Sequence, residues 1–175
     1  MRTHRAALLL ATLIVLTGCA ATPPGPFTLA SSDIDAEGYV PDSARGNVEQ
    51  YCGDGDNVSP AFTWTGTPAG TESFVLLMTD PNYAAYDHWV VTGIDGDSTS
   101  LAAAVDGQVT DGVVGATTRA GGDYVGPCQP DNGYLYTLYA LDAVIEGDSS
   151  TTRAEALELI DGHVLAEASI EAKRH

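Results

Sequence analysis

The sequence predicts an all-β domain, and three observations support this prediction. Its apolar runs are short and rich in β-branched and aromatic residues, which is the composition of strands. Each run is bounded by glycine, proline, aspartate or serine, the residues that favour turns. A clear helix-start signal occurs late, near residue 152, so we expect the helices to be short and peripheral.

Three strands are expected in the first half of the domain. Ala61–Trp64 forms the first, and Gly66–Gly70 supplies the turn behind it. Ser73–Thr79 is apolar almost throughout, which predicts a strand with both faces buried. The third strand, His88–Ile94, is stopped by the turn at Asp95–Gly96.

The longest strand and the clearest helix are expected in the second half. The strand Tyr134–Ala143 has two apolar faces, one with Tyr134, Tyr136, Leu138 and Ala140 and the other with Leu135, Thr137, Tyr139 and Leu141. A capping box at Thr152 and Glu155 predicts a helix that stops at Asp161–Gly162. The segment 163–170 predicts either another partly helical piece or a returning strand.

The first residues have the pattern of a targeting segment. A basic start and the apolar run Ala6–Leu16 precede Leu16-Thr17-Gly18-Cys19, which matches the bacterial lipobox. We expect residues 1–18 to be a lipoprotein signal peptide and Cys19 to be lipidated; an ordinary secretory signal with a chance cysteine is the alternative. Residues 19–26 then form a Pro-rich tether and residues 27–175 the domain. This predicts an extracytoplasmic protein anchored to a bacterial cell membrane, and an outer membrane also fits.

The charge balance excludes one class of partner. The chain has 7 Lys and Arg against 24 Asp and Glu, and a net charge of −17. Nucleic-acid binding needs clustered cations, which this chain lacks. Any phosphate would have to be held by local donors against an unfavourable overall field.

The cysteines indicate a disulfide. Once Cys19 is lipidated, Cys52 and Cys128 remain, and an exported protein favours a structural disulfide between them. A free buried pair is the alternative.

Asp80 and His88 are the candidate functional pair. Each lies at the end of an apolar run, where side chains can converge on a pocket. Alone they fit a structural pair, a catalytic acid/base pair or half of a metal site. A third element favours function: residues 120–133 hold four glycines and two prolines, so their backbone can approach a ligand and offer N–H groups to an anion.

Several segments resemble one known family, the phosphatidylethanolamine-binding proteins, in the bacterial branch similar to Raf-kinase inhibitors. They are Asp80-Pro81-Asn82, Asp87-His88-Trp89-Val90-Val91, Gly126-Pro127-Cys128-Gln129-Pro130, Tyr139-Ala140-Leu141-Asp142, Cys52-Gly53-Asp54-Gly55 with Ser59-Pro60 and Trp64, and Gly162-His163-Val164-Leu165-Ala166. The resemblance runs in order from about Phe27 to the C-terminus and implies a β-sandwich of two packed antiparallel sheets.

The resemblance also implies a ligand pocket, formed by Asp80, Pro81, His88, Tyr124, Gly126 and Tyr134. The implied activity is non-catalytic binding of a small anionic or zwitterionic group, such as phosphate or a phosphoethanolamine head group, without a cofactor or metal. Two departures bear on the ligand: Asn132 stands where the family has a second pocket histidine, and Asn82 replaces an acid. Both put the ligand in question, whereas the fold is unaffected.

Two other functions remain open at this point. One is a protein-interaction or protease-inhibitor module whose pocket is vestigial. The other is a hydrolase that uses Asp80 and His88, although the chain has no Gly-x-Ser-x-Gly, His-Glu-x-x-His, P-loop or dinucleotide motif. His163, in an apolar context, is expected to be a packing histidine. The Asp-rich segments at Asp54 and Asp95 fail the EF-hand pattern and are interpreted as turns.

Overall fold

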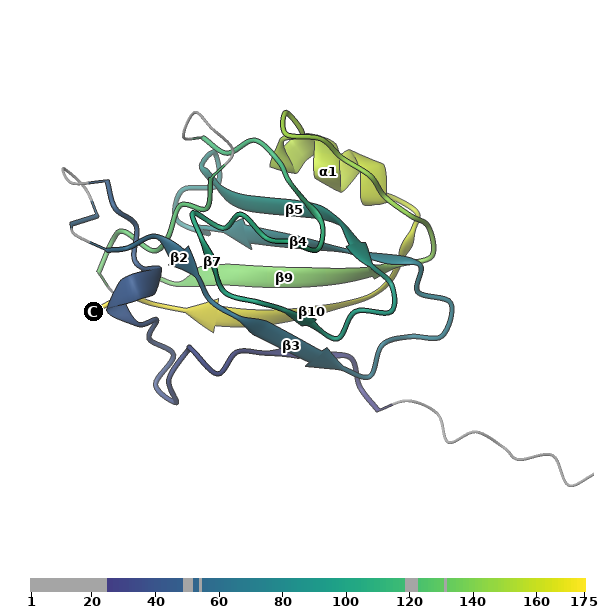
Figure 1. Cartoon of the computed structure of the whole chain (residues 1–175), viewed down its shortest axis with the longest axis horizontal. Helices are drawn as coiled ribbons and strands as arrows, with labels where there is room; N and C mark the ends of the chain where they lie inside the picture. The colour runs from purple at the N-terminus through teal and green to yellow at the C-terminus, as the bar shows by residue number, and fades with distance from the viewer. Residues whose placement is uncertain (1–24, 49–51, 54, 119–122, 131) are drawn as a thin grey trace, which may run out of the picture.

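The computed structural model describes residues 25–48, 52–53, 55–118, 123–130 and 132–175 (Figure 1). The expected signal peptide, Cys19 and residues 20–24 lie outside the described residues. The elements in chain order are β1 (Thr28–Ala30), the 3-10 helix η1 (Asp42–Ala44), β2 (Val58–Ser59), β3 (Phe62–Thr65), β4 (Ser73–Thr79), β5 (Asp87–Asp95), β6 (Ser100–Leu101), β7 (Ala104–Val105), β8 (Val113–Val114), β9 (Tyr134–Leu141), α1 (Arg153–Ile160) and β10 (Val164–Ala172).

The strands form antiparallel sheets, as the sequence predicts. A five-stranded sheet has the order β10-β9-β4-β5-β8, and a three-stranded sheet has the order β1-β3-β6. A two-stranded sheet, β2-β7, is an addition that the sequence did not indicate, because strands of two residues leave no periodic pattern. In Figure 1 the small sheets lie across one face of the five-stranded sheet, and α1 lies on its other side.

The central strands β4 and β9 contribute side chains to a core on each face, as predicted for Ser73–Thr79 and Tyr134–Ala143. The expectation that the latter is the longest strand is wrong, because β9 ends at Leu141 with 8 residues, whereas β5 and β10 have 9 each. In β4, Phe74, Leu76 and Met78 join the core under the small sheets, whereas Val75 and Leu77 join the core under α1. The same division separates the even and odd residues of β9: Tyr134, Tyr136, Leu138 and Ala140 lie in the first core, and Tyr139 and Leu141 pack in the second. The sandwich therefore has three layers and two apolar cores.

Helix α1 begins as predicted. The side chain of Thr152 accepts from the Glu155 backbone N–H at 3.3 Å, and the Glu155 carboxylate accepts from the Thr152 N–H at 2.8 Å. The segment after the helix is the returning strand β10, which pairs with β9. None of the described helices has the length and apolar character that crossing a bilayer requires.

Asn57 connects three loops at one end of the sandwich. It is fully buried and has a φ of 57°, a backbone conformation that Asn tolerates better than most residues. Its Oδ1 accepts from the Gly126 N–H at 3.1 Å, and its Nδ2 donates to Asp106 Oδ1 at 3.0 Å and to the Tyr124 carbonyl. Its own N–H donates to the Arg45 carbonyl at 3.0 Å. The side chain and main chain of Asn57 together thus join the segments at Arg45, Asp106 and 124–126, which are far apart in sequence.

A disulfide joins two of the same segments. Cys52 and Cys128 are bonded, and the Gly46 N–H donates to the Pro127 carbonyl at 3.3 Å. The Arg174 guanidinium, from the C-terminus, donates to the Cys52 carbonyl. The disulfide pairing expected from the cysteine count is the one the structure contains.

Replacing Asn57 is expected to destabilise the fold strongly. Asn57→Ala leaves the Gly126 N–H and the Tyr124 carbonyl buried without partners and puts alanine at positive φ, so we expect a loss of about 2–4 kcal/mol. Urea denaturation measures it. The exposed Asn82 supplies the control, because Asn82→Ala should change the free energy of unfolding by about 0.5 kcal/mol or less. Equal stability of the two variants would refute the role given to Asn57.

Removing the disulfide is expected to lower stability by about 4 kcal/mol, the chain-entropy value for a cross-link between residues this far apart. The measurement compares denaturant unfolding of the wild type with that of the double variant Cys52→Ser/Cys128→Ser. A reductant should destabilise only the wild type. If oxidised wild type and double variant unfold at the same midpoint, the cross-link contributes nothing.

Candidate functional site

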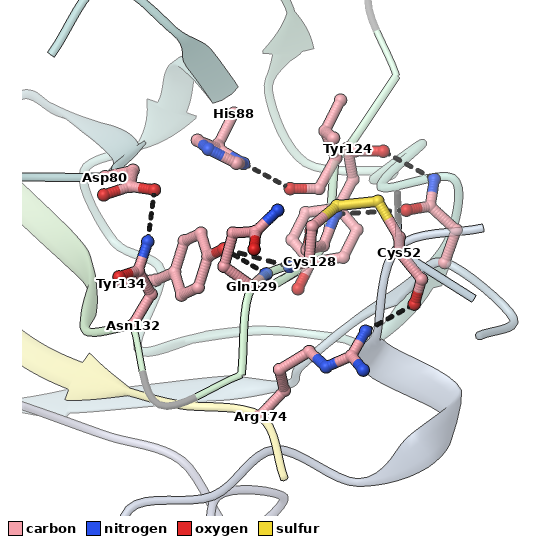
Figure 2. The surroundings of a disulfide bond; sticks show 12 residues. Cys52, Asp80, His88, Tyr124, Cys128, Gln129, Asn132, Tyr134 and Arg174 are labelled. Atoms are coloured by element: carbon pink, nitrogen blue, oxygen red, sulfur yellow. Dashed lines mark hydrogen bonds between the residues drawn. A yellow bond between two sulfur atoms is a disulfide. The ribbon is translucent and has the colours of Figure 1, made fainter. Parts of the chain in front are cut away.

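The sheet register brings Asp80, His88 and Tyr134 to one pocket. In β4, Thr79 pairs with Asp87 of β5 on one side and with Leu135 of β9 on the other, so the three residues lie at adjacent strand ends. They line a pocket of about 490 Å³, and Figure 2 shows them around a common space. The lining residues are Val48, Cys52, Asp80, Tyr83, Tyr86, His88, Thr118, Cys128, Gln129 and Tyr134.

Asp80 supplies a buried carboxylate. Its side chain is 3% exposed, Oδ1 accepts from the Asn82 N–H at 2.7 Å, and Oδ2 accepts from Asn132 Nδ2 at 3.0 Å. A carboxylate has about four acceptor sites, so each oxygen keeps capacity for a donor from a ligand. Of the lining residues in the described part of the chain, Asp80 alone carries a carboxylate, and none is Lys or Arg.

His88 presents its second ring nitrogen to the pocket. Nδ1 lies 2.7 Å from the Val125 carbonyl oxygen, which makes Nδ1 the donor and leaves Nε2 as the free nitrogen. The ring is therefore oriented by Val125; within the described residues no hydrogen bond joins it to Asp80, which the sequence analysis had considered. Burial lowers the pKa of His88 below its ordinary value of 6.5, against the smaller raising effects of the Val125 hydrogen bond and of Asp80 and Asp87.

Tyr134 uses the backbone donors of the Gly/Pro-rich turn. Its hydroxyl oxygen accepts from the Cys128 N–H at 3.0 Å and from the Gln129 N–H at 2.9 Å (Figure 2). The Gly126 N–H is donated to Asn57, and Pro127 and Pro130 have no N–H to offer. The N–H groups of Gly126, Cys128 and Gln129 are thus engaged inside the protein and are not open to an anion. Residues 120–122 and 131 of the predicted anion nest lie outside the described residues.

Aromatic rings form much of the remaining wall. The His88 ring lies 4.8 Å from the Tyr86 ring and 5.1 Å from the Tyr134 ring, measured between centroids. Tyr83, 62% exposed, lies at the rim in the loop between β4 and β5. Arg153 of α1 holds this loop, because its Nε donates to Asp87 at 2.6 Å and its Nη2 donates to the Ala84 carbonyl.

The structure places Pro81, Tyr124 and Gly126 outside the pocket lining. Tyr124 is fully buried, and its hydroxyl donates to the Ala44 carbonyl at 3.1 Å and lies 2.8 Å from the Tyr136 hydroxyl. Burial raises the pKa of Tyr124 well above its ordinary value. A side chain at Gly126 would collide with the backbone of Ala44, so packing explains this glycine. Pro81 is exposed beside Asp80.

Three further polar residues singled out in the sequence, Asn82, Asn132 and His163, find partners within the protein. Asn132 and Asn82, the two departures from the family pattern, bond each other at 3.0 Å, and both donate to Asp80. His163 is exposed and pairs with Asp142 at 2.9 Å, so the expectation of a packing histidine is wrong: a surface carboxylate satisfies its ring. Among the described residues, no group of three or more His, Cys, Asp or Glu is placed to hold a metal ion.

The sequence analysis missed several lining residues. Val48 and Thr118 lie in loops without a motif, and Tyr83 and Tyr86 carry no signal beyond their proximity to Asp80. Cys52, Cys128 and Gln129 were noted only as disulfide or turn residues. Their contribution depends on how loops from distant parts of the chain meet, which a local pattern does not contain.

The comparisons with known proteins identify the relatives of this chain. A family model described as phosphatidylethanolamine-binding protein matches residues 30–175. A UPF0098 protein of Methanothermobacter thermautotrophicus is 37% identical, over 72% of this chain and 89% of its own length. A protein described as a lipoprotein, LppC of Mycobacterium tuberculosis, is 31% identical over 91% of this chain and 89% of its own.

A solved structure shows the same fold. The crystal structure of YbcL of Escherichia coli, described as a member of the mammalian PEBP family, has a TM-score of 0.75 and 26% identity, and the match covers 85% of this chain and 98% of YbcL. The family model spans nearly the whole described domain. The chain belongs to the phosphatidylethanolamine-binding protein family.

Proposed function

We propose that this protein is a lipid-anchored, extracytoplasmic binding protein that takes a small zwitterionic phospholipid head group in its pocket without catalysing a reaction. The observation that carries the proposal is the pairing of one buried carboxylate, Asp80, with one free ring nitrogen, His88 Nε2, on the same pocket. The ammonium of a phosphoethanolamine group would bind Asp80, and its phosphate would bind His88 Nε2.

Asp80 and the aromatic wall favour the ammonium end. The carboxylate has unused acceptor capacity, and a charge-assisted hydrogen bond in a buried site is stronger than a neutral one. The rings of Tyr86 and Tyr134 flank the same space, and aromatic faces attract organic cations. The overall charge of −17 also favours a ligand that is not a bare anion.

His88 is suited to the phosphate end. When its Nε2 is protonated, the ring becomes a cationic donor, while Nδ1 keeps its bond to Val125. The hydroxyl hydrogen of Tyr134 is available as well, because its oxygen serves as the acceptor for two backbone N–H groups. With the turn's own N–H groups engaged, recognition falls mainly to side chains.

Three observations support the non-catalytic, anchored part of the proposal. Both described cysteines at the pocket are joined in a disulfide, so neither offers a thiolate nucleophile. Asp80 and His88 make their hydrogen bonds to other partners and do not form an acid–base pair with each other. The lipobox at Cys19 and the similarity to LppC support the lipid anchor.

The ligand is tested with glycerophosphoethanolamine, followed by NMR. Loss of a charge-assisted hydrogen bond is worth about 1.5–3 kcal/mol, so His88→Ala and Asp80→Asn should each weaken binding about tenfold or more. Inorganic phosphate distinguishes the ammonium-binding end of the pocket from its phosphate-binding end. Asp80→Asn should not weaken the binding of inorganic phosphate, whereas His88→Ala should. The matched controls are Asp142→Asn and His163→Ala, which alter a similar pair on the surface and should leave affinity unchanged. The proposal would be refuted if no saturable shift appeared at about 10 mM ligand, because a dissociation constant of that size corresponds to a binding free energy of only about 3 kcal/mol.

The protonation of His88 gives a second test. Its pKa in the folded protein is below 6.5, so as pH falls through 6.5 the unfolded chain takes up the proton first, and the contribution of this group to stability decreases until the folded ring is also protonated. An NMR titration of the ring, assigned with His88→Gln, should show a midpoint below 6.5 that rises when glycerophosphoethanolamine binds. A midpoint at or above 6.5 in the free protein would contradict the assignment of a buried, neutral ring.

A further inference from the structure

The N-terminal end of the described chain leaves the sandwich far from the pocket. Phe27 stacks on Phe74, with ring centroids 6.1 Å apart, and Pro26 lies against Gly66 just beyond β3. Phe74 is the second residue of β4, beside the pair Ser73–Leu141. Figure 1 shows the purple start of the chain near the β3 arrowhead at the right, whereas the β4 arrowhead points to the left.

The pocket lies at the opposite end of the same strand. Asp80 directly follows β4, six residues after Phe74, which corresponds to a separation of about 20 Å at about 3.3 Å per residue. Tyr83, a lining residue in the loop beyond Asp80, is 62% exposed. The mouth of the pocket is therefore beyond the strand ends, away from Pro26.

The chain between the lipidation position and the domain is short. From Cys19 to Gly25 are six residue steps, which span at most about 20 Å in any conformation. The head-group layer of a bilayer takes about 5–7 Å of that reach. About 15 Å of the reach from Cys19 then remain outside the bilayer. If the pocket faced the bilayer, Gly25 would stand more than about 20 Å above the membrane surface, because the length of β4 separates it from the pocket.

We propose that the anchored protein presents its pocket away from the bilayer that carries it and takes a water-soluble head-group compound, such as a glycerophosphodiester, instead of an intact lipid of that bilayer. This inference rests on the lipid anchor and the ligand class proposed above.

Energy transfer from labelled variants of the acylated protein tests the orientation. Ala69→Cys, in the exposed turn after β3, and Ala85→Cys, in the exposed loop between β4 and β5, are matched sites at the two ends. Each carries a donor dye, and the vesicles contain phosphatidylcholine, phosphatidylethanolamine and a lipid with an acceptor dye on its head group. We expect higher transfer from position 69 than from position 85. Equal or higher transfer from position 85 would overturn the proposal.

A variant with a longer tether tests whether the short tether is what orients the domain. Insertion of about 20 Gly and Ser residues after Thr22 gives a flexible chain with an r.m.s. span of about 28 Å between Cys19 and Gly25, and this should abolish the difference between the two sites. A difference that persists in this variant would show that the short tether is not what orients the domain, and would also overturn the proposal.

Ligand binding distinguishes this inference from the proposed function. The acylated protein is titrated with glycerophosphoethanolamine in the same vesicles and in micelles of a sugar-headgroup detergent. We expect dissociation constants that agree within about twofold, because the bilayer lipid cannot reach the pocket. Affinity that is tenfold weaker in vesicles would mean that membrane lipid occupies the pocket, and would overturn the inference. Absence of binding in both media would refute the proposed function, while the energy transfer would still decide the orientation.

Discussion

The buried amide of Asn57 is the interaction on which the pocket end of the sandwich depends. The loops there have no regular secondary structure, so their backbone groups need other partners. Asn57 supplies both an acceptor for Gly126 and donors for Asp106 and the Tyr124 carbonyl. Its own main chain adds a bond to Arg45. The Cys52–Cys128 disulfide and the hydrogen bond from Arg174 to the Cys52 carbonyl add further links at the same end.

The same arrangement decides how a ligand can be recognised. A Gly/Pro-rich turn could offer its N–H groups to an anion, but here Asn57 and Tyr134 accept the described ones. In the binding mode we propose, recognition falls to Asp80 and His88, whose burial makes each interaction stronger and each unpaired state more costly. The turn therefore builds the pocket wall, and the strand ends supply its chemistry.

Charge and attachment impose a second constraint. A domain with a net charge of −17 and with the carboxylate of Asp80 in its pocket is poorly suited to a bare anion. A ligand with its own cationic end would relieve that conflict. The N-terminal segment meets the sandwich beside Phe74, one strand length from Asp80. The fold thus separates the end where the described chain begins from the end that holds the pocket.

The sequence by itself determined the central strands, the helix start at Thr152 and the positions of Asp80 and His88 at strand ends. Those features are local: a buried strand shows in Ser73–Thr79 because both faces need apolar side chains, and a capping box needs only four residues. Tertiary structure alone decided that Tyr124 and Gly126 face the core, that Asn57 holds the loops, and that Tyr83 and Thr118 reach the pocket. Each depends on loops distant in sequence meeting at close range, and the hydrogen-bond partners they find there leave no periodic trace along the chain.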